Sequence, residues 1–224
     1  HILNNDIVSP NTSILMTAND DNPHLALNDP STIWATLVKP DGQTDTINTS
    51  LPNVLFTPAS KPQEEATLTY NTNELQSGDY ILKAKVRDAT GNLSSEDGYQ
   101  IRFKVIQEAS ISNIYPYPNP FSTQMKFVYT LTGSQIPDYM KIQILTITGK
   151  VVREISQDEL GVIRIGNNIT EFTWYGTDEF GDQLANGVYL YKVTSKINGE
   201  ELPTMETSGD SFFTNGFGKI YLAR

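Results

Sequence analysis

The sequence contains no cysteine, so disulfide bonds, thiol nucleophiles and thiolate metal sites are all excluded. It also has no run of about 18 apolar residues, and it therefore predicts no membrane-spanning helix. The first ten residues lack the basic segment followed by an apolar segment that marks a signal peptide. If the protein is exported, we expect the export signal to lie upstream of this sequence.

Histidine is almost as scarce, because His1 and His24 are the only two among 224 residues. Imidazole is the usual group for acid–base catalysis near neutral pH. His24 follows Asp20 and Asp21 and could act as a base or a metal ligand, although a single histidine in a polar loop is usually just solvated. No Gly-x-Ser-x-Gly segment is present to hold a nucleophilic serine. We therefore expect no catalytic residue and no cofactor in this chain.

Acidic residues cluster in several places, and such clusters can serve glycoside hydrolysis or calcium binding. The carboxylate pairs are Asp178/Asp182, Glu64/Glu65 and Asp158/Glu159, and the oxygen-rich clusters lie at 19–22, 41–45 and 178–182. Each falls in a predicted turn, where aspartate side chains accept hydrogen bonds from nearby backbone N–H groups. None has the full twelve-residue ligand pattern of a helix-loop-helix calcium site. Turn formation is the expected role, and calcium binding is the alternative.

Positive charge is in the minority, with 16 lysine and arginine residues against 26 aspartate and glutamate residues, for a net charge of −10. Phosphate binding needs a basic patch, and none is evident along the sequence. We therefore expect no nucleic-acid partner. A negative surface keeps an exported protein soluble but does not by itself identify a partner.

The most frequent pattern in the sequence is alternation of apolar and polar residues with a period of two. Segments 80–87 and 100–105 alternate apolar with polar or basic residues, as half-buried antiparallel strands do. Short turns rich in glycine, proline, asparagine and aspartate separate such segments, and no helical period extends over three turns. The pattern predicts an all-β chain of two tandem immunoglobulin-like antiparallel β-sandwiches. Further strands are expected at 13–17, 32–38, 54–57, 66–70, 126–131, 141–147, 150–155, 169–174, 188–196 and 219–222.

A boundary between two domains is expected near 107–115. Three prolines follow at every second position, Pro116, Pro118 and Pro120, and they remove three backbone donors from any ladder. A stiff, extended segment that leads to Phe121 as the first core residue fits this spacing. We therefore divide the chain into residues 1–108, a spacer sandwich, and residues 109–224, a C-terminal sandwich.

The two halves share one local pattern. Leu75, Gly78 and Tyr80 match Leu184, Gly187 and Tyr189 at a constant offset of 109 residues. In both halves a Gly-x-Tyr segment opens a long alternating strand. Glycine permits the turn, and the tyrosine can pack its ring while its hydroxyl caps loop backbone. We expect the same corner in both domains.

The two tryptophans, Trp34 and Trp174, allow two interpretations. Aromatic rings can form a platform on which sugars stack, and an accessory carbohydrate-binding module is one candidate function. Both tryptophans, however, lie in or at the end of apolar strands, at 32–38 and 169–174. The expectation is that both belong to the sandwich cores.

Four motifs occur in order in the second half. They are Tyr117-Pro-Asn-Pro-Phe121, the turn at Thr148-Gly149-Lys150 that leads to Val152, the segment from Trp174 through Gly176 to Asp178, and the segment from Leu184 through Gly187 to Tyr189. The ordered set resembles the type IX secretion C-terminal sorting domains and the FlgD-like immunoglobulin domains. The ending from Gly216 to Arg224 is similar to the tails of gingipain-like (family C25) cysteine peptidases.

The resemblance implies a non-catalytic region of a large protein that is secreted or displayed on the outer surface of a Gram-negative bacterium. The implied partners are the outer-membrane secretion machinery and upstream domains of the same polypeptide. The implied docking residues are Gly187, Tyr189, Lys219 and Arg224. About twenty residues separate the 188–196 strand from Lys219, more than sorting domains usually have, so a purely structural terminal domain is the alternative.

Overall fold

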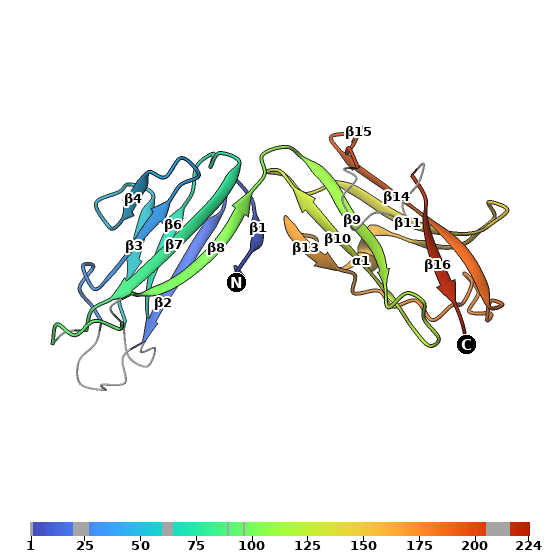
Figure 1. The fold of residues 1–224 in the computed structure, drawn as a ribbon, viewed down its shortest axis with the longest axis horizontal. Helices are drawn as coiled ribbons and strands as arrows, with labels where there is room; N and C mark the ends of the chain where they lie inside the picture. Colours follow the sequence, from blue (N-terminus) through green and yellow to red (C-terminus); the bar gives the residue numbers. More distant parts are fainter. Residues whose placement is uncertain (1, 20–26, 60–64, 89, 96, 205–215) are drawn as a thin grey trace. The chain divides into compact units, whose positions relative to one another are not determined.

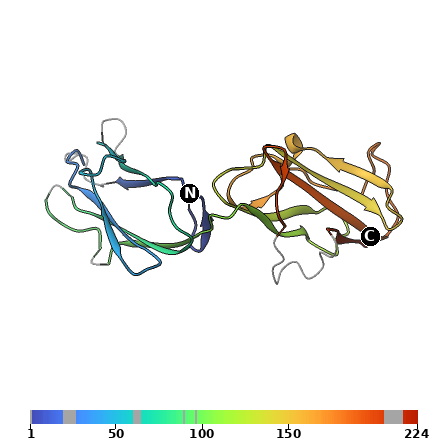
Figure 2. The ribbon, with the colours of Figure 1, turned by 90° about the horizontal axis from the view of Figure 1, so that it is seen from above.

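The computed structural model describes residues 2–19, 27–59, 65–88, 90–95, 97–204 and 216–224. The chain divides into two compact units, His1–Gln107 (the first unit) and Glu108–Arg224 (the second unit). In each unit the strands form two layers (Figure 1, Figure 2). This confirms the expected fold class of immunoglobulin-like β-sandwiches. None of the helices in the described ranges has the length and apolar character needed to cross a membrane.

The first unit pairs a five-stranded sheet, in the order β1-β8-β7-β3-β4, with a three-stranded sheet, β2-β6-β5. β1 runs parallel to β8 and the other pairs are antiparallel. The strands are β1 (Asp6–Val8), β2 (Ser13–Asn19), β3 (Ile33–Val38), β4 (Thr44–Ile47), β5 (Val54–Thr57), β6 (Glu65–Asn71), β7 (Gly78–Val86) and β8 (Tyr99–Val105).

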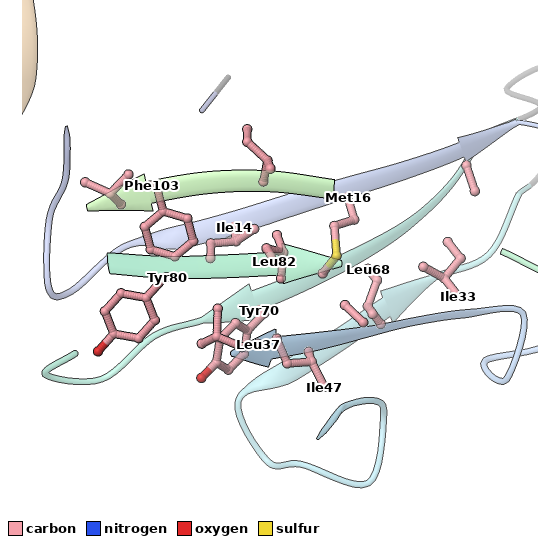
Figure 3. Close-up of a cluster of buried hydrophobic side chains, with 14 of the residues drawn as sticks. Ile14, Met16, Ile33, Leu37, Ile47, Leu68, Tyr70, Tyr80, Leu82 and Phe103 are labelled. Atoms are coloured by element: carbon pink, nitrogen blue, oxygen red, sulfur yellow. The ribbon is translucent and has the colours of Figure 1, made fainter. Parts of the chain in front are cut away.

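The core of the first unit lies between these sheets because alternate side chains of each strand point inward. Tyr80 and Phe103, from the neighbouring strands β7 and β8, stack with ring centroids 5.3 Å apart. Inward residues of β2 and β6 close the core from the other sheet (Figure 3). They include Ile14, Met16 and Leu68.

The second unit has one sheet in the order β13-β10-β9 and another in the order β12-β11-β14-β15, with β16 pairing the first half of β14. Its elements are β9 (Ser110–Tyr117), β10 (Lys126–Thr132), β11 (Tyr139–Thr146), β12 (Val151–Ile155), α1 (Gln157–Leu160), β13 (Gly166–Ile169), β14 (Gly187–Ile197), β15 (Glu200–Glu201) and β16 (Gly218–Leu222). Fully buried aromatic side chains fill the space between the sheets: Phe127, Tyr129, Trp174 and Tyr191.

Two expectations about strands need correction. The strand expected at 169–174 is instead β13, Gly166–Ile169, and beyond it Trp174 forms only an isolated bridge to Met125. The region expected to link the domains contains β9, which includes Pro116. β9 lies at the edge of its sheet, where half of the backbone donors need no ladder partner, so a proline is tolerated.

Candidate functional site

The four predicted docking residues lie around one pair of strands, β14 and β16. Gly187 opens β14 opposite Leu222, and Tyr189 lies opposite Ile220. Lys219 lies opposite Leu190, and Arg224 follows the end of β16. The register therefore brings these residues together at one end of the second unit, although they are up to 37 positions apart in the sequence.

Tyr189 is part of the core and is only 8% exposed. Its hydroxyl donates a hydrogen bond to the Ala185 carbonyl at 2.8 Å, and its ring meets Trp174 edge-on with centroids 5.9 Å apart. The backbone of Gly187 has φ 155°, which opens the corner before the tyrosine. Tyr189 shapes the site from beneath and offers little surface to a partner.

Arg224 is held by the chain itself. Its guanidinium donates hydrogen bonds to the carbonyls of Leu184 and Tyr175 at 2.8 Å and of Gly176 at 3.0 Å. Its backbone N–H donates to Asn186 Oδ1, and its carbonyl accepts from Asn186 Nδ2. The arginine therefore ties the end of β16 to the loop between Trp174 and β14, and most of its donors are already used.

The backbone of β16 is hydrogen-bonded on both sides. β14 pairs with one side, and the segment at Asn119–Phe121 pairs with the other. The Phe121 N–H donates to the Tyr221 carbonyl at 3.0 Å, and the Asn119 side chain accepts from the Tyr221 N–H at 2.8 Å. A partner strand cannot add to β16 at these positions, so recognition there has to use side chains.

The outward side chains next to Lys219 were not singled out from the sequence. Val188 and Tyr221 lie directly opposite each other and are 38% and 36% exposed. With the exposed Lys219 they form the β14–β16 surface: Val188, Lys219 and Tyr221. Alternation along β14 and β16 is the signal that could have found it, once the two strands were known to pair.

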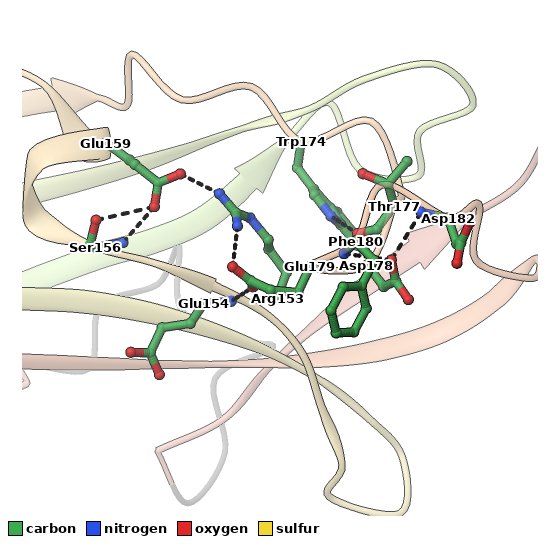
Figure 4. A network of polar contacts seen from close by, with 10 residues as sticks. All are labelled: Arg153, Glu154, Ser156, Glu159, Trp174, Thr177, Asp178, Glu179, Phe180 and Asp182. Atoms are coloured by element: carbon green, nitrogen blue, oxygen red, sulfur yellow. Dashed lines mark hydrogen bonds and ion pairs between the residues drawn. The ribbon is translucent and has the colours of Figure 1, made fainter.

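A polar network supports the loop that follows Trp174 (Figure 4). Arg153 on β12 binds Glu159 of α1 and also Glu179, the latter with N–O distance 2.6 Å. Asp178 Oδ1 accepts hydrogen bonds from the N–H groups of Phe180 and Asp182, both at 2.9 Å. The carboxylates of Asp178 and Glu159 thus hold the backbone and an arginine, as expected for turn residues and caps.

The calcium alternative finds no support at 41–45. The Asp41 carboxylate accepts from the Gln43 N–H at 2.9 Å, while Asp45 pairs with Lys39 at 3.0 Å. Across the parts of the chain that the structure describes, no three acidic or histidine side chains gather in a metal-binding group. Most of the 19–22 cluster, Glu64 and both histidines lie outside those parts.

The two tryptophans have different environments. Trp174 is 1% exposed and its Nε1–H donates to the Thr177 carbonyl at 2.8 Å, which confirms its place in the core. Trp34 is half-buried on the outward side of β3, with the Arg87 guanidinium carbon 5.5 Å from its ring centroid. The expectation that Trp34 is a core residue is wrong, because its neighbours Ile33 and Ala35 take the inward positions.

No protein-family model matches the sequence, and no curated protein matches it. Among solved structures, the chain is similar to dimeric latent PorU from Porphyromonas gingivalis, at 18% identity and a TM-score of 0.36. That alignment covers 99% of this chain and 19% of the PorU chain.

Two further solved structures show similarities of the same order. A tetra-tandem repeat from the extending region of a large adhesion protein aligns at 15% identity and a TM-score of 0.31, over 95% of this chain and 50% of that one. The fibronectin(III)-like modules of CbhA from Clostridium thermocellum align at 12% identity and a TM-score of 0.28, over 98% and 90%. This chain therefore spans about a fifth of PorU and half of the adhesion-protein repeat.

Proposed function

We propose that this chain is the non-catalytic C-terminal region of a large protein that is secreted to, or anchored on, the outer surface of a Gram-negative bacterium. The two sandwiches act as a spacer for upstream domains of the same polypeptide. The second unit docks on the outer-membrane machinery of type IX secretion. In this proposal any enzymatic activity, such as that of a cysteine peptidase, belongs to the upstream part of the parent protein.

The observation that carries the proposal is that three of the four motifs, spread over about 70 residues, meet at the Trp174 side chain. Phe121 packs against Trp174 with centroids 5.5 Å apart, and Tyr189 packs against the same indole at 5.9 Å. Arg224 then hydrogen-bonds to Tyr175 and Gly176, directly after that tryptophan. These three motifs therefore form one structural unit, which supports the resemblance to the sorting-type and FlgD-like domains.

Docking in this proposal uses the side chains of the β14–β16 surface. Val188 and Tyr221 offer a small apolar pair, and Lys219 offers an exposed cation beside it. The backbone of β16 is fixed on both sides by hydrogen bonds, so no backbone ordering cost arises when a partner binds these side chains. Arg224 and the buried Tyr189 position this surface.

The test is surface delivery of a reporter fused to residues 1–224 in a bacterium that has type IX secretion. The docking variant is Lys219→Glu with Tyr221→Ala, and we expect it to abolish delivery while the chain stays folded. The control is Lys126→Glu with Ile169→Ala, which reverses one lysine and truncates one exposed apolar side chain on the other sheet. Failure of the unmodified fusion to reach the surface would leave only the spacer role, and delivery of the docking variant would refute the β14–β16 surface.

A second candidate function, carbohydrate binding, is favoured by the position of Trp34. Its ring is half-buried on an open sheet face, whereas Trp174 is enclosed in the core and unavailable to a ligand. Sugar binding would therefore concern the first unit and would be independent of docking by the second.

A further inference from the structure

Residues 176–184 of the second unit form a hairpin loop with an exposed aromatic side chain at its tip. The hairpin is closed at its base, where the Leu184 N–H donates to the Gly176 carbonyl at 3.0 Å. Phe180 lies at the far end and is 90% exposed, more than any other large apolar side chain in the described parts of the chain. We call residues 178–182 the Phe180 tip.

Hydrogen bonds within the Phe180 tip fix its backbone. The Asp178 N–H donates to the Asp182 carbonyl at 2.9 Å, and the Gly181 N–H donates to the Asp178 carbonyl at 3.2 Å. The Asp178 carboxylate accepts from the N–H groups of Phe180 and Asp182, both at 2.9 Å. The backbone beneath the phenyl ring therefore needs no ordering when a partner binds, and the side chain itself has only two rotatable bonds.

The Phe180 tip is also fastened to the sheet at β12 (Figure 4). The Glu179 carboxylate accepts from the Arg153 guanidinium at 2.6 Å and from the Glu154 N–H at 3.2 Å. Arg153 in turn binds Glu159, and its guanidinium carbon lies 4.9 Å from the centroid of the Phe172 ring. The position of the tip on the second unit is therefore set by contacts with strand, helix and core.

The phenyl ring has no part in these contacts. The tip uses only the backbone N–H of Phe180, which any residue except proline would supply, and the ring is not part of the core of the second unit. A single exposed apolar residue usually needs no explanation. Phe180 differs because a rigid loop, in which small or polar residues would suffice, holds a large aromatic side chain in water.

The base of the hairpin adjoins the β14–β16 surface. Arg224, which follows β16, donates to the carbonyls of Gly176 and Leu184, the two residues that close the hairpin. Val188 of the β14–β16 surface is four positions after Leu184. Phe180 is four residues from Gly176 and thus at most about 14 Å from it. A protein interface of ordinary size, about 800 Å² on each partner, can cover both features.

Negative charge surrounds the ring. Three of the five residues of the Phe180 tip are acidic: Asp178, Glu179 and Asp182. The cation that binds the tip, Arg153, is shared between Glu179 and Glu159. A partner that receives the ring is therefore favoured by lysine or arginine side chains around its binding pocket.

We propose that Phe180 anchors the second unit in an apolar pocket with a basic rim on a protein of the outer-membrane secretion machinery. Aromatic side chains of this kind contribute most to binding when a pocket encloses them fully. A second copy of this chain and an anionic membrane are both disfavoured, because the protein carries a net charge of −10 and the tip is itself acidic. The inference rests on the proposed export function and adds a second contact to its docking site.

The test uses the reporter fused to residues 1–224 in a bacterium that has type IX secretion. We expect Phe180→Ser to lower surface delivery at least about tenfold, the loss typical of truncating an aromatic anchor. The control Val162→Ser removes another apolar side chain of the second unit, 83% exposed, and should lower delivery less than about twofold. Both variants should keep the thermal midpoint within about 2 °C of the unmodified chain.

A charge reversal tests the basic rim. Asp182→Lys places a cation beside the ring and should lower delivery about three- to tenfold. Glu200→Lys makes the same charge change at β15 and should alter delivery less than about twofold. Equal effects of the two reversals would refute the basic rim. Full delivery of Phe180→Ser would refute the anchor and leave the β14–β16 surface standing, whereas failure of the unmodified fusion would remove the export proposal and this inference together.

Photocrosslinking identifies the occupant of the site. Benzoylphenylalanine replaces Phe180 or, as the control, Val162 in the exported fusion, and crosslinked products are identified by mass spectrometry. We expect a product with a component of the secretion machinery from position 180 and none from position 162. Products formed only with a second copy of the chain, or only with lipid, would replace the proposed partner by that occupant.

Discussion

The Tyr189 hydroxyl donates a hydrogen bond to the Ala185 carbonyl, four residues earlier, at 2.8 Å. The first unit contains the same bond, from the Tyr80 hydroxyl to the Gln76 carbonyl at 2.9 Å. Donors and acceptors are both offset by 109 residues, since 189 − 80 and 185 − 76 are equal. The shared Gly-x-Tyr pattern therefore encodes the same corner in both sandwiches, as expected from the sequence.

Removing either hydroxyl should weaken its own unit. Tyr80→Phe and Tyr189→Phe keep the ring contacts with Phe103 and Trp174 but leave a loop carbonyl without its donor. We expect each to lower the free energy of unfolding by about 1 kcal/mol. Chemical denaturation followed by unit-specific NMR signals would measure this. An unchanged stability in both variants would mean that the corner is held by ring packing alone.

Gly176 leaves the space that Arg224 occupies. A Cβ added there would lie 2.6 Å from Arg224 Nη2, and the residue has φ 70°. Gly176→Ala should therefore cost the strain of a positive φ, about 1–2 kcal/mol, and in addition displace the guanidinium from its carbonyl partners. Gly181→Ala is the matched control, because Gly181 has φ 90° with open space around it. Thermal unfolding should show a larger loss for Gly176→Ala.

The same comparison in an Arg224→Ala background isolates the arginine. Without its guanidinium, the excess cost of Gly176→Ala over Gly181→Ala should shrink by about 1 kcal/mol. An excess that stays the same would show that contacts with Leu222, and not the arginine, limit the space at Gly176.

Gly218 is required by the buried Tyr191. A Cβ at Gly218 would overlap the Tyr191 phenol ring, which is 1% exposed. The ring cannot move aside, because its hydroxyl donates to the Ile114 carbonyl and it makes an edge-to-face contact with the Phe127 ring. We expect Gly218→Ala to destabilise the second unit by about 3 kcal/mol or to detach β16.

Hydrogen exchange at the β16 amides Ile220 and Leu222 would distinguish detachment from general loss of stability. Lys219→Ala, on the same strand but exposed, should change stability by less than about 0.5 kcal/mol. Protection of those amides and full stability in Gly218→Ala would contradict the tight contact with Tyr191.

The sequence predicts much of this fold because alternation is a local signal. Period two located both long corner strands, β7 and β14, and the turn residues marked their beginnings. The inward or outward direction of Trp34 was not predictable from apolar character alone, since Val38 and Trp34 are both apolar and both lie on the outer side of β3. A strand that is apolar on both faces carries no clear signal of which face is buried.

The sequence also did not predict which segments far apart in the chain pair with each other. The Asn119 side chain bonds the backbone of Lys219, 100 residues away, and this contact together with the Phe121 bridge covers the outer side of β16. No local pattern encodes such pairing, because strand order depends on which edges remain free after the sheets form.

The Asp88 carboxyl should titrate at unusually low pH. Hydrogen bonds from Asn92, above all, and from Thr90 lower its pKa from 3.8 to about 2. Because the Asp88 pKa is lower in the folded than in the unfolded chain, ionisation of Asp88 stabilises the folded state. That contribution is complete above the unfolded value near 3.8 and is lost as the pH falls through about 2. Carbon-13 NMR titration of the carboxyl group would measure it.

Asn92→Ala removes the main donor to that carboxylate and should raise the Asp88 pKa toward 3.8. Asp29, whose pKa is lowered by hydrogen bonds from Ser31, serves as an internal reference that should not change. A shift of both groups would indicate a global change of the first unit, and no shift of Asp88 would mean that Thr90 and the loop backbone lower its pKa without the Asn92 side chain.

The environments of the two tryptophans predict opposite spectroscopic and energetic behaviour. In Trp34→Phe the remaining indole, Trp174, is 1% exposed, so its fluorescence should be blue-shifted and resist quenching by acrylamide. In Trp174→Phe the remaining Trp34 lies half-exposed beside Arg87 and should emit further to the red and be quenched readily. Trp34→Phe should alter stability by less than about 0.5 kcal/mol, because it empties no core space.

Trp174→Phe should cost about 2–4 kcal/mol, because it leaves a cavity among Phe121 and Tyr189 and deprives the Thr177 carbonyl of its donor. The loss should be confined to the second unit. A small loss of stability in Trp174→Phe, or quenching of Trp174 by acrylamide as readily as Trp34, would contradict this. It would mean that Trp174 does not join the sorting-type motifs in the core. The proposal that these motifs form one structural unit would then lose its central contact.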